Sequence, residues 1–303
     1  MLSTAGTLRM NKVSAYLWTL PRWFALPSAV AAIVLGSVIS GQSPLVTVIA
    51  SLAGAMMVAY AHTWNSFQDW VSGFDQGTVS ERSHEKPYTG GQNLIARGVV
   101  GVWEVCSIAI AYLVLSALFT AFLAAATTPW VWLPWGLIAC CAPLYSWGKR
   151  TYTCELVLGL GFGPLAVMFG AATHPGPLLL QAFLAGIPLG LTFGYAAEVV
   201  DQYIDADANV PKGLRNIGAM CWKKGWGLYG ALFIIIILTG VAHVALARVG
   251  ILSAYSLIGW PFLMGLLYLA NKLEKREKLA LLTGLGMVFA YPFVVVIMEV
   301  IYG

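Results

Sequence analysis

Nine continuous apolar runs, each about 20 residues long, constrain this chain more than any other feature of its sequence. An α-helix needs about 20 apolar residues to cross the hydrocarbon core of a bilayer. The runs occupy residues 23–41, 44–64, 101–125, 128–146, 154–172, 177–198, 226–247, 250–270 and 280–301. A transmembrane β-barrel would instead show segments of about 10 residues with alternating polarity. We therefore predict an all-α, polytopic membrane protein with nine transmembrane helices and a single domain over residues 1–303.

The composition agrees with a membrane protein. Charged residues make up 10% of the 303-residue chain, whereas soluble globular chains carry about 25%. This scarcity excludes a soluble cytosolic enzyme, a disordered chain and a nucleic-acid-binding module. The first 20 residues have no cleavage site after an apolar core, so we expect no signal peptide. The five cysteines show no spacing typical of a metal site or a disulfide framework.

Lysine and arginine residues lie almost entirely on one side of the predicted spans. If every apolar run crosses the membrane once, 16 of the 17 basic residues share one face and only Arg248 lies on the other. Cytoplasmic loops of membrane proteins carry such an excess of Lys and Arg. We therefore expect an integral cell (inner) membrane protein with a cytoplasmic N-terminus and an external C-terminus.

Acidic residues gather in two connections on that same face. Eight of the 13 carboxylates lie in the connections after the second and the sixth run, four spans apart. In the first connection Asn65 and Asp69 are four residues apart, so a continuing helix places them on one face. Gly73 can end that helix, and Asp75 follows it.

The second connection repeats this arrangement with Glu198, Asp201 and Asp205, which also share one helical face. Two carboxylate faces from different helices repel each other unless a cation lies between them. Oxygen ligands without sulfur favour Mg²⁺, which binds through a few carboxylates together with substrate phosphates. Basic side chains nearby suit a diphosphate; they are Arg82, Lys86, Lys149, Lys212 and Arg215. Solvated loops of mixed charge are the alternative interpretation, and the matching positions of the two motifs weaken it.

The spacing of Asn65, Asp69, Gly73 and Asp75 resembles the first motif of the UbiA superfamily of intramembrane prenyltransferases. It is similar in particular to the MenA-like (1,4-dihydroxy-2-naphthoate polyprenyltransferase-like) branch, where the last Asp follows the Asn by ten residues. Other branches place that Asp eight residues after the Asn, where this chain has Gly73. The resemblance covers nearly the whole chain. Three further segments carry it: LPRWFALP at 20–27, KPYTGGQ at 86–92 and YSWGKRTYTCELVLGLGFGP at 145–164.

The resemblance implies nine helices around one central chamber, with a cytoplasmic-side cap. It also implies that a prenyl group passes from a polyprenyl diphosphate to a hydrophobic acceptor, with Mg²⁺ as cofactor. The implied catalytic residues are Asn65, Asp69, Lys149, Asp201 and Asp205. The implied metal ligands are Asn65, Asp69, Asp75, Asp201 and Asp205. The implied substrate-binding residues are Arg22, Arg82, Lys86, Tyr145, Tyr152, Glu198 and Lys212. Aromatic faces can stabilise the allylic cation; candidates are Tyr145, Tyr152, Phe193 and Tyr195.

The second motif departs from the family pattern in two ways. The family often has Asn four residues before the first Asp, where this chain has Ala197; the adjacent Glu198 can supply the missing oxygen. The loop after Asp205 is longer than in the family, which leaves the roles of Asp207 and Lys212 open.

The leading hypothesis is a prenyltransferase that acts on an aromatic or quinone-precursor acceptor. A second hypothesis keeps the fold and changes the acceptor: lycopene elongation, a glycerol lipid or intramolecular cyclisation. A third is a non-enzymatic transporter that uses the acids as an ion path. Transporters hold ionisable residues near the membrane midplane, whereas here they gather at one surface. His62, one turn before Asn65, is expected to be a packed helix histidine, with a role in positioning a ligand as the alternative.

Overall fold

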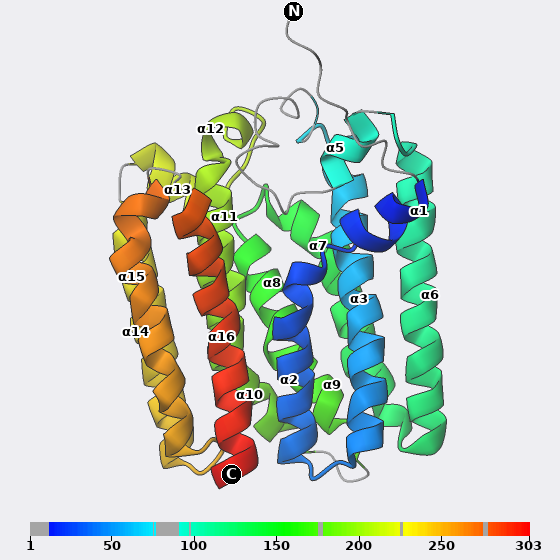
Figure 1. Cartoon of the computed structure of the whole chain (residues 1–303), viewed down its shortest axis with the longest axis vertical. Helices are drawn as coiled ribbons and strands as arrows, with labels where there is room; N and C mark the ends of the chain where they lie inside the picture. The colour runs from blue at the N-terminus through cyan, green and yellow to red at the C-terminus, as the bar shows by residue number, and fades with distance from the viewer. Residues whose placement is uncertain are drawn as a thin grey trace, which may run out of the picture.

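Long helices run side by side along the molecule (Figure 1). This computed structural model of the chain describes residues 12–74, 76, 91–96, 98–174, 178–224, 227–274 and 278–303. Within those residues the structure consists of helices and turns and has no strand. The all-α prediction is confirmed for that part of the chain.

Each predicted apolar run coincides with helical structure. The corresponding elements are α2 (Leu26–Ile39), α3 (Pro44–Val71), α6 (Val102–Ala126), α7 (Trp132–Gly148), α8 with α9 (Cys154–Phe162, Pro164–Ala171), α10 with η4 and α11 (Leu179–Gly190, Leu191–Ala197, Glu198–Ile204), α14 (Leu228–Arg248), η5 with α15 (Ala254–Gly259, Trp260–Glu274) and α16 (Lys278–Tyr302). Short helices complete the chain: α1 (Lys12–Ser14), η1 (Ala15–Thr19), η2 (Trp23–Ala25), α5 (Gly91–Ala96), η3 (Pro129–Val131), α12 (Ala206–Asn209) and α13 (Ile217–Lys224).

Six helical stretches of the described chain are long and apolar enough to cross a membrane. They are Lys12–Ile39, Pro44–Val71, Val102–Ala126, Cys154–Ala171, Leu179–Ile204 and Leu228–Arg248. The outward sides of these helices carry exposed aliphatic residues, such as Leu118 on α6 and Val241 on α14, both 61% exposed. Apolar surface of this kind suits contact with lipid. The protein is therefore an integral, multi-pass membrane protein, and the number of nine spans stays a prediction.

Two of the predicted runs are broken, for local reasons. Pro164 begins α9 directly after Gly163, and a Cβ on Gly163 would lie 2.4 Å from the backbone nitrogen of Gly190. Only glycine allows this close approach between the α8–α9 junction and α10. In α10, Pro188 has no N–H for the helical ladder, and the π-helix η4 follows three residues later. This wider segment leads directly into Glu198 and α11.

The two acidic segments lie at the same end of the molecule. The Lys212 Nζ donates to the carbonyl oxygens of Phe74 and Gln76, at 2.6 and 2.7 Å. Phe74 also packs in one apolar cluster with Leu214 and Ala219. The end of the first acidic segment therefore contacts the connection that follows the second. Helices α5, α12 and α13 gather at this end (Figure 1), while the cap as a whole stays a prediction because residues 77–90 lie outside the described part.

Candidate active site

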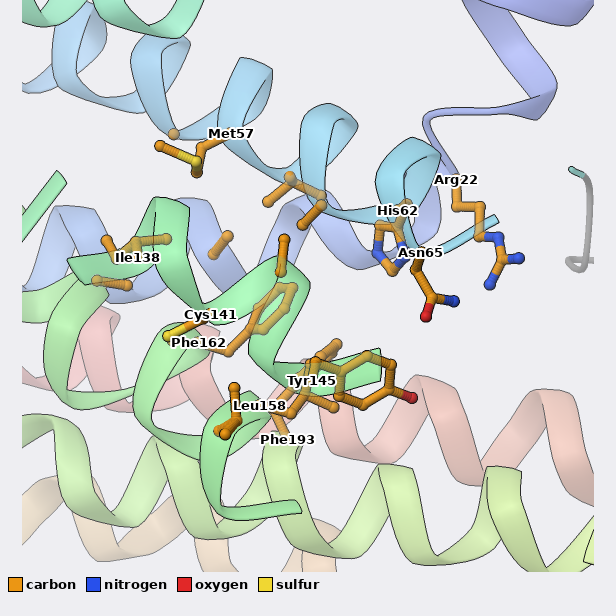
Figure 2. A pocket seen from close by; sticks show the side chains of 18 of the residues that line it. Arg22, Met57, His62, Asn65, Ile138, Cys141, Tyr145, Leu158, Phe162 and Phe193 are labelled. Atoms are coloured by element: carbon orange, nitrogen blue, oxygen red, sulfur yellow. The ribbon is translucent and has the colours of Figure 1, made fainter. Parts of the chain in front are cut away.

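A cavity that is partly open to solvent lies between α2, α3, α7, α8, α9, η4, α11 and α16 (Figure 2). Its polar side chains, which we call the polar mouth, are Arg22, His62, Asn65, Tyr145, Glu198 and Asp201. They lie toward the end of the helices that carries the acidic segments. The deeper lining is apolar and includes Ile33, Met57, Ile138, Ala166 and Phe169. A space with one polar end and a long apolar interior suits an amphiphile with a charged head and a hydrocarbon tail.

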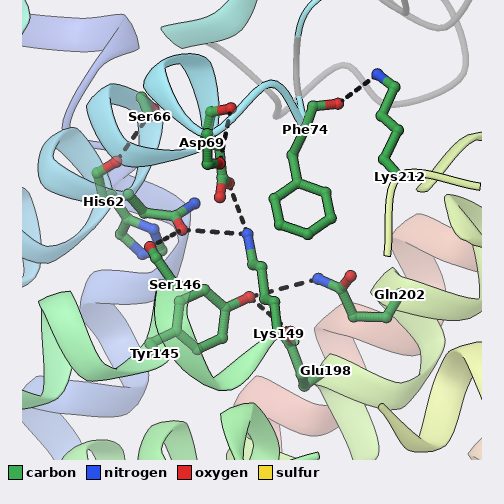
Figure 3. Close-up of polar contacts among 12 residues, drawn as sticks. His62, Ser66, Asp69, Phe74, Tyr145, Ser146, Lys149, Glu198, Gln202 and Lys212 are labelled. Atoms are coloured by element: carbon green, nitrogen blue, oxygen red, sulfur yellow. Dashed lines mark hydrogen bonds and ion pairs between the residues drawn. The ribbon is translucent and has the colours of Figure 1, made fainter. Parts of the chain in front are cut away.

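A buried ion pair stands beside the mouth. The Lys149 Nζ lies 2.6 Å from Oδ2 of Asp69 and donates to Oδ1 of Asn65 at 3.2 Å (Figure 3). Ser146 Oγ donates to the same Asn65 oxygen at 3.1 Å. Lys149 is 6% and Asp69 2% exposed, so this charge pair is almost fully desolvated. The pair joins the first acidic motif on α3 to the last turn of α7.

The same turn of α7 contacts the second acidic motif. Tyr145 OH donates to Oε1 of Glu198 at 2.5 Å, and Gln202 Nε2 donates to the Tyr145 oxygen at 3.4 Å. The Lys149 ammonium lies 4.8 Å from the centroid of the Tyr145 ring, within cation–π range. One turn of α7 therefore holds the α3 and α11 motifs on either side of the mouth.

Local chemistry fixes this turn of α7. Pro143 lies inside the helix and cannot donate to the carbonyl of Ala139; Tyr60 OH on α3 donates to that carbonyl at 3.4 Å instead. Lys149 is the C-cap of α7, where a cation is favoured by the helix dipole. Its backbone carbonyl accepts from the N–H of Arg215 at 2.7 Å, so the segment after α12 also docks on this turn.

Arg22 enters the mouth from an unusual backbone conformation. Its φ and ψ are 51° and 58°, in the left-handed region, just before η2. A non-glycine residue in this region is strained, and such residues often occur at functional sites. One guanidinium nitrogen donates to Ser66 Oγ at 3.2 Å, and Nε is buried without a hydrogen-bond partner.

The structure brings most of the predicted site residues together. Arg22, Asn65, Tyr145, Glu198 and Asp201 line the cavity, with Asp69 and Lys149 beside them. Asp205 follows as the C-cap of α11 and does not line the cavity.

Other predicted residues lie elsewhere. Lys212 holds the backbone of the first acidic segment and is not part of the cavity lining. The side chain of Tyr152 is 57% exposed and also lies outside the lining. Asp75, Arg82 and Lys86 lie outside the described residues.

The oxygen atoms at the mouth suit a metal ion that is bound jointly by the protein and a diphosphate, rather than by protein ligands alone. In the described residues, no group of three or more His, Cys, Asp and Glu side chains could hold a metal ion. However, Oδ1 of Asp69 is buried and has no hydrogen-bond partner, while Oδ2 is paired with Lys149. A lone carboxylate oxygen at an oxygen-rich mouth suits Mg²⁺, which takes few protein ligands and completes its shell with phosphates and water.

Sequence reasoning missed most of the aromatic lining. Five rings contact one another in a closed series, which we call the aromatic collar: Phe24, His62, Phe162, Phe193 and Phe289. All five line the cavity. They come from η2, α3, α8, η4 and α16, so no sequence spacing could have grouped them. Only Phe193 was among the predicted aromatic candidates.

The chain belongs to the UbiA prenyltransferase family, whose sequence profile matches residues 23–285. Family members transfer prenyl groups, so the protein is a membrane-embedded prenyltransferase. A comparison with curated proteins finds no match.

Solved structures share the fold. An apo UbiA homolog from Aeropyrum pernix K1 superposes with a TM-score of 0.69 at 17% identity, over 92% of this chain and 96% of that one. A UbiA homolog from Archaeoglobus fulgidus bound to DMAPP and Mg²⁺ gives 0.59 at 18% identity, over 93% and 99%. A digeranylgeranylglyceryl phosphate synthase gives 0.60 at 17% identity, over 96% and 98%.

Proposed function

We propose that this prenyltransferase moves a prenyl group from a polyprenyl diphosphate to an aromatic, quinone-precursor acceptor, with Mg²⁺, as in the MenA-like branch. The observation that carries the proposal is the polar mouth, flanked by both acidic motifs, at one end of an apolar cavity. The diphosphate would lie at the mouth and the isoprenoid chain in the cavity. The A. fulgidus homologs bound to DMAPP with Mg²⁺ and to GPP with Mg²⁺ support this pairing of donor and metal.

Residues of both motifs would hold the metal and the diphosphate. The proposed metal ligands are Asn65, Asp69, Asp75, Asp201 and Asp205. Bound Mg²⁺ would neutralise negative charge on the diphosphate as it leaves. Arg22 and Lys149 would add positive charge on the protein side, with Arg82 and Lys86 as further proposed contacts.

The reaction separates charge, and the site suits that separation. The C–O bond of the donor breaks and its electron pair leaves with the diphosphate. The acceptor supplies the electron pair for the new bond to the allylic carbon, and the proton that the acceptor loses passes to water. Lys149 can follow the leaving oxygen with its ammonium group, while apolar walls keep water from the allylic cation.

The basis for proposing an aromatic acceptor is the spacing of the first motif. The ten-residue spacing from Asn65 to Asp75 is the MenA-like feature of the chain. A glycerol-lipid acceptor, lycopene and cyclisation without an acceptor are the outcomes that would replace it.

The experiment combines detergent-purified protein, geranyl diphosphate and Mg²⁺ with one acceptor at a time. The acceptors are 1,4-dihydroxy-2-naphthoate, 4-hydroxybenzoate, lycopene and geranylgeranylglyceryl phosphate, with an acceptor-free control. Mass spectrometry of the lipid extract should find a prenylated aromatic product and acceptor-dependent diphosphate release. Release without any acceptor would indicate cyclisation, and release under no condition would contradict prenyl transfer.

We also propose that the N-terminus and the mouth face the cytoplasm, in the cell (inner) membrane. The basis is the clustering of Lys and Arg at the mouth end, with Arg248 at the opposite end of α14. An alkaline phosphatase fusion at the C-terminus should be active, since that enzyme folds only outside the cytoplasm. An inactive C-terminal fusion with an active N-terminal one would reverse the orientation.

A further inference from the structure

His62 is the polar member of the aromatic collar. It lies on α3, three residues before Asn65, and its ring is 5.8 Å from that of Phe24 and 6.5 Å from that of Phe162. Figure 2 shows its ring beside Asn65, facing the cavity. The residue therefore lies where the polar mouth gives way to the apolar interior.

One nitrogen of this histidine has no partner within the protein. Its Nε2 is buried and makes no hydrogen bond. Leaving a buried hydrogen-bonding atom unpaired is costly, so such atoms usually have a partner in the functional state. By contrast, both ring nitrogens of the buried His243 have partners: Tyr291 at 2.9 Å and Ser256 at 2.5 Å. His62 therefore differs from His243 in having a buried ring nitrogen that is unpaired.

The other members of the collar have no polar side-chain atom that could hydrogen-bond this nitrogen. The other four members are phenylalanines, and the rings of Phe162 and Phe193 are stacked with centroids 4.2 Å apart. Phe289 closes the series by contacting both Phe193, at 5.8 Å, and Phe24, at 6.2 Å. A planar molecule entering this collar would meet aromatic faces on most sides and one hydrogen-bonding atom. That combination selects an aromatic ring with a polar substituent.

The position also matches the reaction. Asn65, one helical turn after His62 on α3, is a proposed ligand of the metal that holds the diphosphate. The allylic carbon is bonded directly to a diphosphate oxygen, so it would lie just inside the mouth, at the level of the collar. An acceptor must reach this carbon to form the new bond.

We propose that His62 Nε2 hydrogen-bonds a hydroxyl group of the acceptor and so positions the acceptor ring against the allylic carbon within the aromatic collar. This inference rests on the proposed function and narrows it, because the acceptor must be a hydroxyl-bearing aromatic compound. The imidazole can accept the bond from the hydroxyl or donate to its oxygen, depending on the tautomer. A hydrocarbon acceptor such as lycopene would leave Nε2 unpaired.

The test compares His62 variants on matched acceptors. The acceptor is the hydroxyaromatic compound that the protein prenylates in the experiment above, and its O-methyl ether is the matched analogue. Geranyl diphosphate is the donor. His62→Phe keeps the ring and removes the nitrogen, whereas His62→Gln keeps a hydrogen-bonding group and removes the ring. His174→Phe is the matched control, because His174 follows α9 and does not line the cavity.

If His62 binds the acceptor hydroxyl, wild-type protein should have a higher kcat/KM for the hydroxyl acceptor than for its ether. His62→Phe should lower kcat/KM for the hydroxyl acceptor by about 10- to 100-fold, the effect of losing a buried hydrogen bond. It should leave kcat/KM for the ether and the KM for the donor within about twofold, while His62→Gln should recover part of the loss.

Three results would overturn the inference. An equal loss with both acceptors would mean that His62 only supports the packing. Equal kcat/KM of wild-type protein for the hydroxyl acceptor and its O-methyl ether, or activity on a hydrocarbon acceptor alone, would mean that no acceptor hydroxyl is bound. If wild-type protein releases no diphosphate with any acceptor, the proposed function fails first, and that outcome is visible before any variant is compared.

Discussion

The ammonium nitrogen of Lys149 lies 2.6 Å from Oδ2 of Asp69, and both side chains are buried. Removing one partner of such a pair leaves a buried charge without compensation and typically destabilises the fold by about 3–5 kcal/mol. In the proposed mechanism these two groups also serve the metal and the diphosphate. A substitution at either position therefore acts on stability and on chemistry, and both must be measured.

Removing a motif carboxylate should stop the reaction. Asp69→Ala and Asp201→Ala are each expected to abolish product formation from geranyl diphosphate and Mg²⁺, because the metal and the diphosphate lose a ligand. Asp69→Asn separates chemistry from packing, since it keeps the volume and removes the charge; thermal unfolding in detergent checks that the variant is folded. Asp207→Ala removes a carboxylate outside the motif spacing and should be milder. Equal severity of Asp207→Ala and Asp201→Ala would show that the second motif is wrongly assigned.

Lys149 should matter more in the transition state than in substrate binding. Lys149→Ala is expected to lower kcat by about 100-fold or more, because one charge-stabilising donor is lost as the C–O bond breaks. The KM for geranyl diphosphate should change much less. Arg150→Ala is the matched control, because the Arg150 guanidinium donates to the Ser72 carbonyl and stands over the Phe74 ring rather than in the cavity. Near-normal turnover of folded Lys149→Ala would mean that this lysine is only a topology anchor.

The Tyr145 hydroxyl should hold the second motif in place. Tyr145→Phe removes the 2.5 Å hydrogen bond to Glu198 and keeps the ring beside Lys149. A loss of about 10-fold in kcat/KM for the donor is expected, the scale of one buried hydrogen bond. Tyr112→Phe controls for loss of a tyrosine hydroxyl, since its bond to the Tyr16 carbonyl lies outside the cavity. Equal effects of the two substitutions would remove the special role of Tyr145.

Close packing between α2 and α9 should make Gly170 intolerant of a side chain. A Cβ there would lie 2.0 Å from the carbonyl oxygen of Ile33, and backbone cannot move aside cheaply. Gly170→Ala is expected to destabilise the protein by about 1–3 kcal/mol, the usual cost of overpacking. Gly136→Ala is the control: a Cβ at this α7 position meets nothing within 4 Å and should raise the unfolding temperature slightly. If the two variants melt alike, the close α2–α9 crossing is wrong.

The helices and the common location of the acidic segments were predictable from local signals. Apolar length identified each long helical region, and the spacing of Asn65 and Asp69 placed both on the last turns of α3. The break after Gly163 was not predicted, although a Gly-Pro pair is a common helix interruption. The π-helix η4 after Pro188 was not predicted either. Hydrophobicity alone does not show where the backbone hydrogen bonds of a helix are interrupted.

The partners within the site depended on tertiary packing and could not be read from spacing. Lys149 was expected as a diphosphate contact, and its pairing with Asp69 required α3 and α7 to be adjacent. Tyr152 was expected in the site from its place in a family segment, yet it lies past the end of α7 with an exposed ring. The collar joins Phe24 to Phe289, from opposite ends of the chain. Such contacts are set by how the helices close around the cavity.

The central claim is that the two acidic motifs bind one diphosphate through Mg²⁺. It is tested most directly by calorimetric titration of geranyl diphosphate into detergent-purified wild-type protein, Asp69→Asn, Asp201→Asn and the double variant, each in Mg²⁺ and in EDTA. The account predicts that wild-type protein binds in Mg²⁺ and not in EDTA, and that either single variant loses most of the affinity. It predicts further that the double variant is little worse than the single ones, because both carboxylates serve one ligand. Equal binding in EDTA, or independent and additive losses from the two variants, would contradict it.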